Sequence, residues 1–132
     1  MAKVNGAQSV EKIAGRKIVL SAGVGKTNID ELKWLTKTVL DEASAWKSTG
    51  WAYIADCAKM SPVGPTEGAV LVDMTKAFVD AGCKAFGFAE GSSIMLKAQA
   101  KKNTERSETG VLEGHFATVD EVLDWLKKEV NI

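Results

Sequence analysis

The chain has 132 residues, which is enough for one domain with a sizeable hydrophobic core. Lys plus Arg and Asp plus Glu both number 17, and this neutral balance argues against a dedicated nucleic-acid binder. No apolar run approaches the roughly 18 residues that span a bilayer, and the first residues carry no apolar signal segment. We therefore expect a cytoplasmic protein with no membrane span and no nucleic-acid partner.

The N-terminal part predicts a hairpin followed by a helix. We expect a single domain over 1–132 whose small, polar residues 1–8 fray. Ser9–Ala14 and Lys17–Ala22 alternate in hydrophobicity around a Gly-Arg turn, which indicates two antiparallel strands. Asn28 is the expected N-cap of a helix that runs to about Trp46.

The middle of the chain predicts one βαβ unit. A strand over Trp51–Asp56, a Pro/Gly loop over Ser61–Pro65, a helix over Thr66–Ala81 and a strand over Lys84–Ala89 follow one another. The helix buries an apolar stripe, and Gly82 suits the left-handed position that ends it. A crossover of this length joins parallel strands.

The C-terminal part adds two helices and a strand. We expect a helix from Ile94 to about Lys102, a polar loop over 103–110, a strand over Val111–Phe116 and a final helix that begins with a capping box at Thr118. The predicted order is ββαβαβαβα. It indicates a layered α/β domain with a mixed sheet of about five strands, an N-terminal antiparallel hairpin and then parallel strands, flanked by four helices.

One motif superficially suggests a nucleotide. Gly23–Thr27 follows a strand, precedes a helix and ends in Gly-Lys-Thr, but the phosphate cradle of a P-loop needs a glycine at position 20, which is Leu20. The two glycines are instead expected to permit a turn. The amides at this helix start could alternatively bind a simple anion.

The remaining candidate residues do not indicate a catalytic site or a metal site. His115 is the single histidine, and it is interpreted as a structural residue of the last strand. Cys57 and Cys83 lie at opposite ends of parallel strands, so we expect two thiols rather than a disulfide. An enzyme would need a site assembled from Asp56, Cys57 and His115, for which the sequence gives no support. We expect no catalytic residues, no metal and no cofactor.

Several segments together resemble a known family. These are Lys17–Ser21, the Gly25-Lys-Thr27 segment, the strand ending at Asp56, and the ending Phe116-Ala-Thr-Val-Asp-Glu-Val-Leu-Asp-Trp-Leu126. Over about residues 9–130 the sequence resembles STAS domains, in particular the small bacterial SpoIIAA-like (STAS/SEC14-type) proteins. The resemblance implies a mixed sheet flanked by helices and a non-enzymatic, regulatory role.

The resemblance implies a protein partner. Anti-sigma-factor antagonists of this fold bind a kinase and are released by phosphorylation at the start of the second helix. Thr66 occupies that phosphoacceptor place, although Gly64 and Glu67 replace the motif's usual Asp and Gly, and Thr66 is also explained as an N-cap. The predicted partner-binding loop consists of Ser61, Pro62, Gly64, Pro65, Thr66 and Glu67.

The resemblance to SEC14-type proteins implies an alternative, a carrier or sensor of a lipid or another small amphipathic anion. A shallow apolar groove is predicted along Met74, Phe78, Ile94 and Met95. The sequence leaves open the identity of the partner or ligand and the oligomeric state, a homodimer included.

Overall fold

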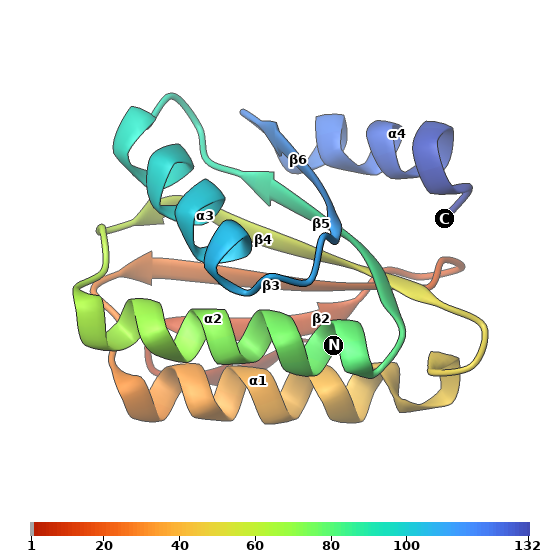
Figure 1. Cartoon of the computed structure of the whole chain (residues 1–132), viewed down its shortest axis with the longest axis horizontal. Helices are drawn as coiled ribbons and strands as arrows, with labels where there is room; N and C mark the ends of the chain where they lie inside the picture. The colour runs from red at the N-terminus through yellow and green to blue at the C-terminus, as the bar shows by residue number, and fades with distance from the viewer. Residues whose placement is uncertain (1) are drawn as a thin grey trace.

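The protein is described by a computed structural model over residues 2–132. A six-stranded mixed sheet forms its centre, with strand order β1-β2-β3-β4-β5-β6 (Figure 1). The strands are β1 (Lys3–Asn5), β2 (Gln8–Lys12), β3 (Ile18–Gly25), β4 (Trp51–Met60), β5 (Cys83–Ala89) and β6 (Leu112–Phe116). β1, β2 and β3 pair antiparallel, and β3 to β6 pair parallel. The predicted mixed α/β architecture is confirmed, with one more strand than expected.

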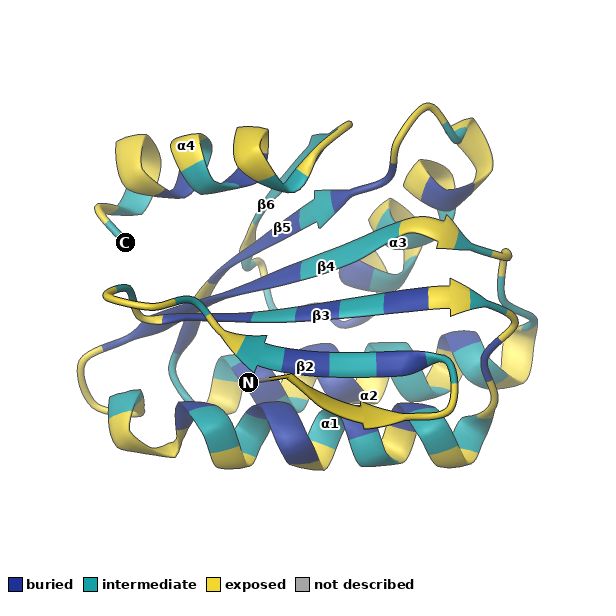
Figure 2. Cartoon of the chain, turned by 180° about the vertical axis from the view of Figure 1, so that it is seen from behind, coloured by how far each residue is buried: buried dark blue, intermediate teal, exposed yellow. Residues whose placement is uncertain are grey.

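The helices cover the two faces of the sheet unequally. They are α1 (Ile29–Ala43, followed by the short 3-10 turn Ser44–Trp46), α2 (Pro65–Asp80), α3 (Ile94–Arg106) and α4 (Val119–Val130). α1, α2 and α3 lie on one face, and α4 lies on the other, over β4, β5 and β6 (Figures 1 and 2). Each helix between parallel strands is a crossover, as the predicted βαβ connections require.

The extra strand lies in the segment that was expected to fray. That prediction is wrong for residues 3–8, because Lys3–Asn5 pairs with Gln8–Val10 in a hairpin. The amide of Ala7 donates to Glu31 of α1 at 3.3 Å, and buried Gln8 donates to Thr27 at 3.1 Å. Met1 lies outside the described residues. This hairpin is ordered by contacts with a segment that is distant in the sequence, and local sequence patterns do not indicate such contacts.

Several element boundaries also differ from the prediction. β3 continues through Gly25, so Gly23 belongs to a strand with a register shift and not to a turn. β4 extends four residues beyond Asp56, and the two strands remain paired over this extension (Val24 with Lys59, Gly25 with Met60). α3 continues to Arg106, where a loop from residue 103 was expected.

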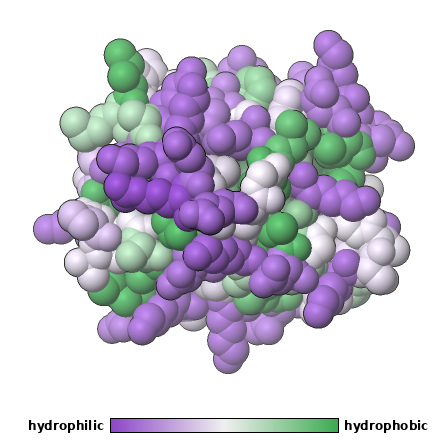
Figure 3. All heavy atoms as spheres, in the orientation of Figure 1, coloured by the Kyte–Doolittle hydropathy of each residue, from purple (hydrophilic) through white to green (hydrophobic). Residues whose placement is uncertain are grey.

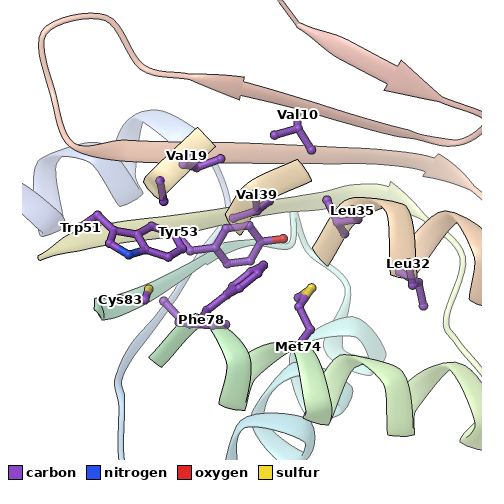
Figure 4. Close-up of a cluster of buried hydrophobic side chains, with 12 residues drawn as sticks. Val10, Val19, Leu32, Leu35, Val39, Trp51, Tyr53, Met74, Phe78 and Cys83 are labelled. Carbon is purple, nitrogen blue, oxygen red and sulfur yellow. The ribbon is translucent and has the colours of Figure 1, made fainter. Parts of the chain in front are cut away.

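The core on the three-helix face is built from aromatic rings. Trp51 and Tyr53 of β4 contact Phe78 of α2 with ring centroids 5.6 and 4.9 Å apart, and Tyr53 contacts Phe86 of β5 at 5.2 Å. Figure 4 shows Trp51, Tyr53 and Phe78 between the sheet and the helices, with Val39 and Leu35 of α1 beside them. Tilted and edge-on ring pairs of this kind add to the free energy of burial.

The opposite face of β4 and β5 carries small and aliphatic side chains under α4. Ala52, Ile54, Ala85 and Ala89 pack there against helix residues that include Val122 and Leu126. Two glycines, Gly87 and Gly114, are directly paired across β5 and β6 on this face. A Cβ at Gly87 would collide with Cγ1 of Val122, and one at Gly114 would lie 2.8 Å from the ring of Trp125. Their bare backbones allow α4 to lie close to the sheet.

We predict that Gly87→Ala destabilises the fold by about 1–3 kcal/mol, because its methyl group overpacks the contact between α4 and β5. Gly68→Ala is the matched control, since its new Cβ would meet only Asn103, at 3.5 Å, and alanine is favoured within a helix. Urea denaturation of both variants measures the effect. Equal midpoints for the two variants would contradict the close approach of α4.

Candidate functional site

The carboxyl edge of the parallel strands is where this fold places loops and helix starts. β3, β4 and β5 end there, and α1, α2 and α3 begin there. In open α/β sheets, ligands bind at this edge because the loops can diverge around a site while the strands hold them. The predicted partner-binding loop, His115 and Cys57 all lie on this side of the molecule.

A largely apolar cavity of about 100 Å³ lies on the three-helix face near this edge. One water molecule needs about 10–15 Å³ on this measure, so the space holds several non-hydrogen atoms. The sheet contributes Tyr53, Ala55, Phe86 and Phe88, while α1 and α2 contribute Leu32, Leu35, Leu71 and Met74. Exposed Ser61 also lines the cavity, which therefore reaches the surface beside the loop after β4.

Side-chain size along the strands explains where the cavity lies. On the face toward α1 and α2, β4 carries Trp51, Tyr53 and then Ala55. β3 likewise passes from Val19 to Ser21. Large side chains fill the layer near the amino edge, and small ones leave it open near the carboxyl edge.

One face of helix α3 forms a wall of the cavity. Leu96, Gln99, Ala100, Asn103 and Thr104 line it, at spacings of three and four residues. The backbone of Val63 is held to the side chain of Gln99 by two hydrogen bonds: Val63 N–H donates at 3.0 Å, and Gln99 Nε2 donates to Val63 O at 2.8 Å. α3 and the loop after β4 are therefore joined across the cavity's edge.

The cavity also contains a polar pair. The hydroxyls of Ser21 and Tyr53 share a short hydrogen bond in the buried layer. Burial raises the pKa of Tyr53 well above its ordinary value, and the bond to Ser21 opposes that shift in part. The phenol is therefore a neutral hydrogen-bonding group.

The four residues of the predicted groove do not form one surface. Met74 lines the cavity, and Phe78 is buried in the aromatic core. Ile94 and Met95 are 86% and 59% exposed on the first turn of α3, and neither lines the cavity. Helical spacing identified apolar positions in α2 and α3. It does not specify which side of α3 faces the sheet, because that depends on how α3 packs against α2.

The predicted partner-binding loop lies mainly at the surface. Ser61, Pro62, Pro65 and Thr66 are exposed. Thr66 is the second residue of α2, so its predicted N-cap role is wrong; Gly64 holds that position, and its N–H donates to the Glu67 carboxylate at 3.1 Å. The Thr66 hydroxyl is left at the solvent-facing start of a helix.

A cluster of His115, Glu90 and Glu113 adjoins the cavity. Its assembly was not predicted from the sequence. The His115 side chain is 7% exposed, and its Nδ1 lies 2.9 Å from a carboxylate oxygen of Glu90, which is 3% exposed. Its Nε2 lies 2.9 Å from Glu113, and its ring stacks on Phe88 at 5.0 Å. A neutral imidazole has one N–H, so both contacts are hydrogen bonds when the ring is an imidazolium or one carboxyl is protonated. The sequence signal for this cluster was Glu90, a glutamate directly after the buried strand β5.

The cysteines are separated as predicted, and both are free thiols. Burial raises the pKa of Cys57 to about 12, and the nearby Glu90 and Asp56 charges raise it further in the same direction. Burial likewise raises the pKa of Cys83 to about 12. A nucleophilic cysteine needs the opposite shift. The ring nitrogens of His115 meet Glu90 and Glu113, so the arrangement gives Cys57 no activating base.

Over residues 2–132, no group of three or more His, Cys, Asp or Glu side chains is placed to hold a metal ion. None of the described helices is both long enough and apolar enough to cross a membrane.

Comparison with known proteins identifies the fold. No family model matches the sequence, and no curated protein matches it either. Among solved structures, the chain is similar to an uncharacterized protein of the DUF3478 family with a SpoIIAA-like fold from Shewanella loihica. The TM-score is 0.66 at 15% identity, over 91% of this chain and 92% of the other. The protein has a SpoIIAA-like fold, as its sequence resemblance implied.

We predict that His115→Leu destabilises the protein by about 3–5 kcal/mol, because Glu90 then remains buried without its partner. The double variant Glu90→Leu/His115→Leu is expected to regain most of this loss, since it removes the stranded carboxylate. Chemical denaturation measures both. A double variant no more stable than the single one would contradict the electrostatic account.

Proposed function

We propose that this protein is a non-enzymatic carrier or sensor of a small apolar or amphipathic molecule, whose apolar part occupies the cavity under α3. The cavity is the observation that carries the proposal. Close-packed interiors hold few voids larger than a water molecule, and an apolar one is favourably filled by apolar groups. The resemblance to SEC14-type proteins supports the same class of ligand.

The walls suit an amphipathic ligand with its apolar part inside. Leu35, Met74 and Phe86 offer hydrocarbon and aromatic surface in the interior. Gln99 and Ser61 border the same cavity on the side of the loop after β4. A polar head can therefore find hydrogen-bonding groups at the edge while the tail is removed from water.

The structure also suggests how a ligand enters. The hydrogen-bonded pair of Val63 and Gln99 closes the space between the loop and α3. Of the apolar residues of α3, Leu96 alone is buried, so little apolar burial opposes a small outward movement of this helix.

We predict that Ala100→Leu abolishes ligand-induced stabilisation, because the larger side chain fills the cavity. Ala98→Leu is the matched control, since Ala98 is exposed on the same helix. The probes are straight-chain carboxylates from butanoate to decanoate, and the readout is the shift in melting temperature. A ligand present at about 100 times its Kd stabilises by about 2.7 kcal/mol.

Wild type and Ala98→Leu are expected to respond alike, and Ala100→Leu to show no shift. No stabilisation of the wild type by any chain length would refute the proposal. Equal shifts in all three proteins would indicate binding outside the cavity.

A second candidate function, binding a protein partner, is favoured by the surface beside the cavity. The exposed loop over Ser61–Thr66 is stiffened by two prolines and by the contact of Val63 with Gln99. Ile94 and Met95 add exposed apolar side chains at the start of α3. Figure 3 shows hydrophobic groups on this face as separate patches among hydrophilic ones. A movement of α3 on ligand binding would change the shape of this surface. A partner that binds the surface would then distinguish the occupied cavity from the empty one.

We predict that Thr66→Asp weakens the capture of such a partner about tenfold or more, as a charge placed at a recognition surface does. Ser48→Asp, exposed in the turn before β4 at the opposite edge of the sheet, is the control. Affinity capture with quantitative mass spectrometry measures both. Identical partner profiles for wild type and Thr66→Asp would count against this interface and against Thr66 as a regulatory site.

A further inference from the structure

A second pocket, of about 360 Å³, lies at the amino edge of the sheet, away from the cavity. It forms where β3 and β4 begin and where α4 ends. Segments far apart in the sequence meet there: residues 15–17, 49–50, 84, 127 and 130–132.

The pocket is strongly basic. Arg16, Lys17, Lys84 and Lys127 line it, and none of its lining side chains is acidic. The whole chain has no net charge, so this is a local excess. Positive charges gathered around a concave surface raise the local concentration of anions.

Three of the four cations are free to bind an anion. Arg16 is engaged: its Nε donates to the main-chain oxygen of Ile132 at 2.7 Å and its Nη2 to that of Leu123 at 2.8 Å. Ion pairs within residues 2–132 involve Lys3, Lys12 and His115, and none involves Lys17, Lys84 or Lys127.

The end of α4 explains only part of this charge. Lys127 lies in the last turn of α4, where it complements the partial negative charge of the helix terminus. Lys17 precedes β3 and Lys84 belongs to β5, so neither has a helix terminus of its own to balance.

The Lys84 side chain lies across the backbone of Gly50. Gly50 has a φ of +90° and lies under the Lys84 side chain, where an added Cβ would collide with Cε and lie 2.8 Å from Cδ and 3.0 Å from Nζ. The positive φ favours glycine at this position, and the bare backbone leaves room for the lysine stem. The ammonium group of Lys84 lies at the wall of the pocket.

We propose that this amino-edge pocket binds a phosphoryl group. Its free cations, Lys17, Lys84 and Lys127, come from three separate segments of the chain. A tetrahedral dianion presents oxygens in several directions and two charges, whereas a planar carboxylate suits one arginine fork. The site is independent of the apolar cavity, and its ligand is either a soluble phosphate monoester or a lipid headgroup with the same chemistry.

The test is an NMR titration of the full chain with inorganic phosphate, compared with sodium chloride at equal ionic strength. Phosphate is expected to shift the amide signals of Gly15, Gly50 and Asn131 saturably, and chloride is not. Lys17→Gln/Lys84→Gln should weaken this binding about tenfold or more, since two nearby charges are lost. Lys101→Gln/Lys102→Gln, on exposed α3 positions, is the control and should bind as the wild type does.

Two further arms distinguish the sources. Binding of glycerol 1-phosphate without flotation on phosphatidic acid vesicles indicates a soluble ligand. Flotation on phosphatidic acid but not on phosphatidylcholine vesicles, lost in Lys17→Gln/Lys84→Gln alone, indicates a headgroup. Equal shifts with phosphate and chloride, or equal weakening in both double variants, would overturn the proposal, because general charge screening then explains the effect.

Discussion

Burial of strand β4 on both faces is the constraint on which the rest of the structure depends. Trp51 and Tyr53 point to one side and Ala52 and Ile54 to the other, and all four are removed from water. A strand that is apolar on both faces must be covered by a layer on each side. α1 and α2 with the aromatic core supply one layer, and α4, brought close by paired glycines, supplies the other.

The covering layers meet the sheet differently at its two edges, and the candidate sites follow from that difference. Near the amino edge the aromatic core fills the layer, so the interior is closed and a site can form only at the surface. Near the carboxyl edge Ser21 and Ala55 leave space beneath α3. One molecule thus has an interior cavity at one end and a basic surface pocket at the other.

Helix α3 connects the features of the carboxyl edge. One of its faces lines the cavity, Gln99 holds the loop after β4, and its first turn presents Ile94 and Met95 to solvent. The buried contact of His115 with Glu90 lies just before this helix. Packed and hydrogen-bonded groups thus connect the cavity with the surface over a short path. The proposed sensing would also require a ligand that binds one position of α3 more tightly than another.

Sequence patterns determined the elements whose signals are local. The alternating and helical periods, the caps at Asn28 and Thr118, and the glycine after α2 predicted the mixed sheet and the order of the elements after β1 correctly. The distant separation of the two cysteines followed from strand direction alone. These features depend on residues close in the chain, so a short window carries enough information.

Only the tertiary structure decided the rest. The order of residues 3–8 depends on Glu31 and Thr27, and the inward face of α3 depends on α2. Glu90 and His115 are 25 residues apart, and the basic pocket is lined by residues between positions 15 and 132. The size gradient along β3 and β4 becomes a cavity only when helices close over it. Sites made by distant segments follow from packing, which no local pattern of residues specifies.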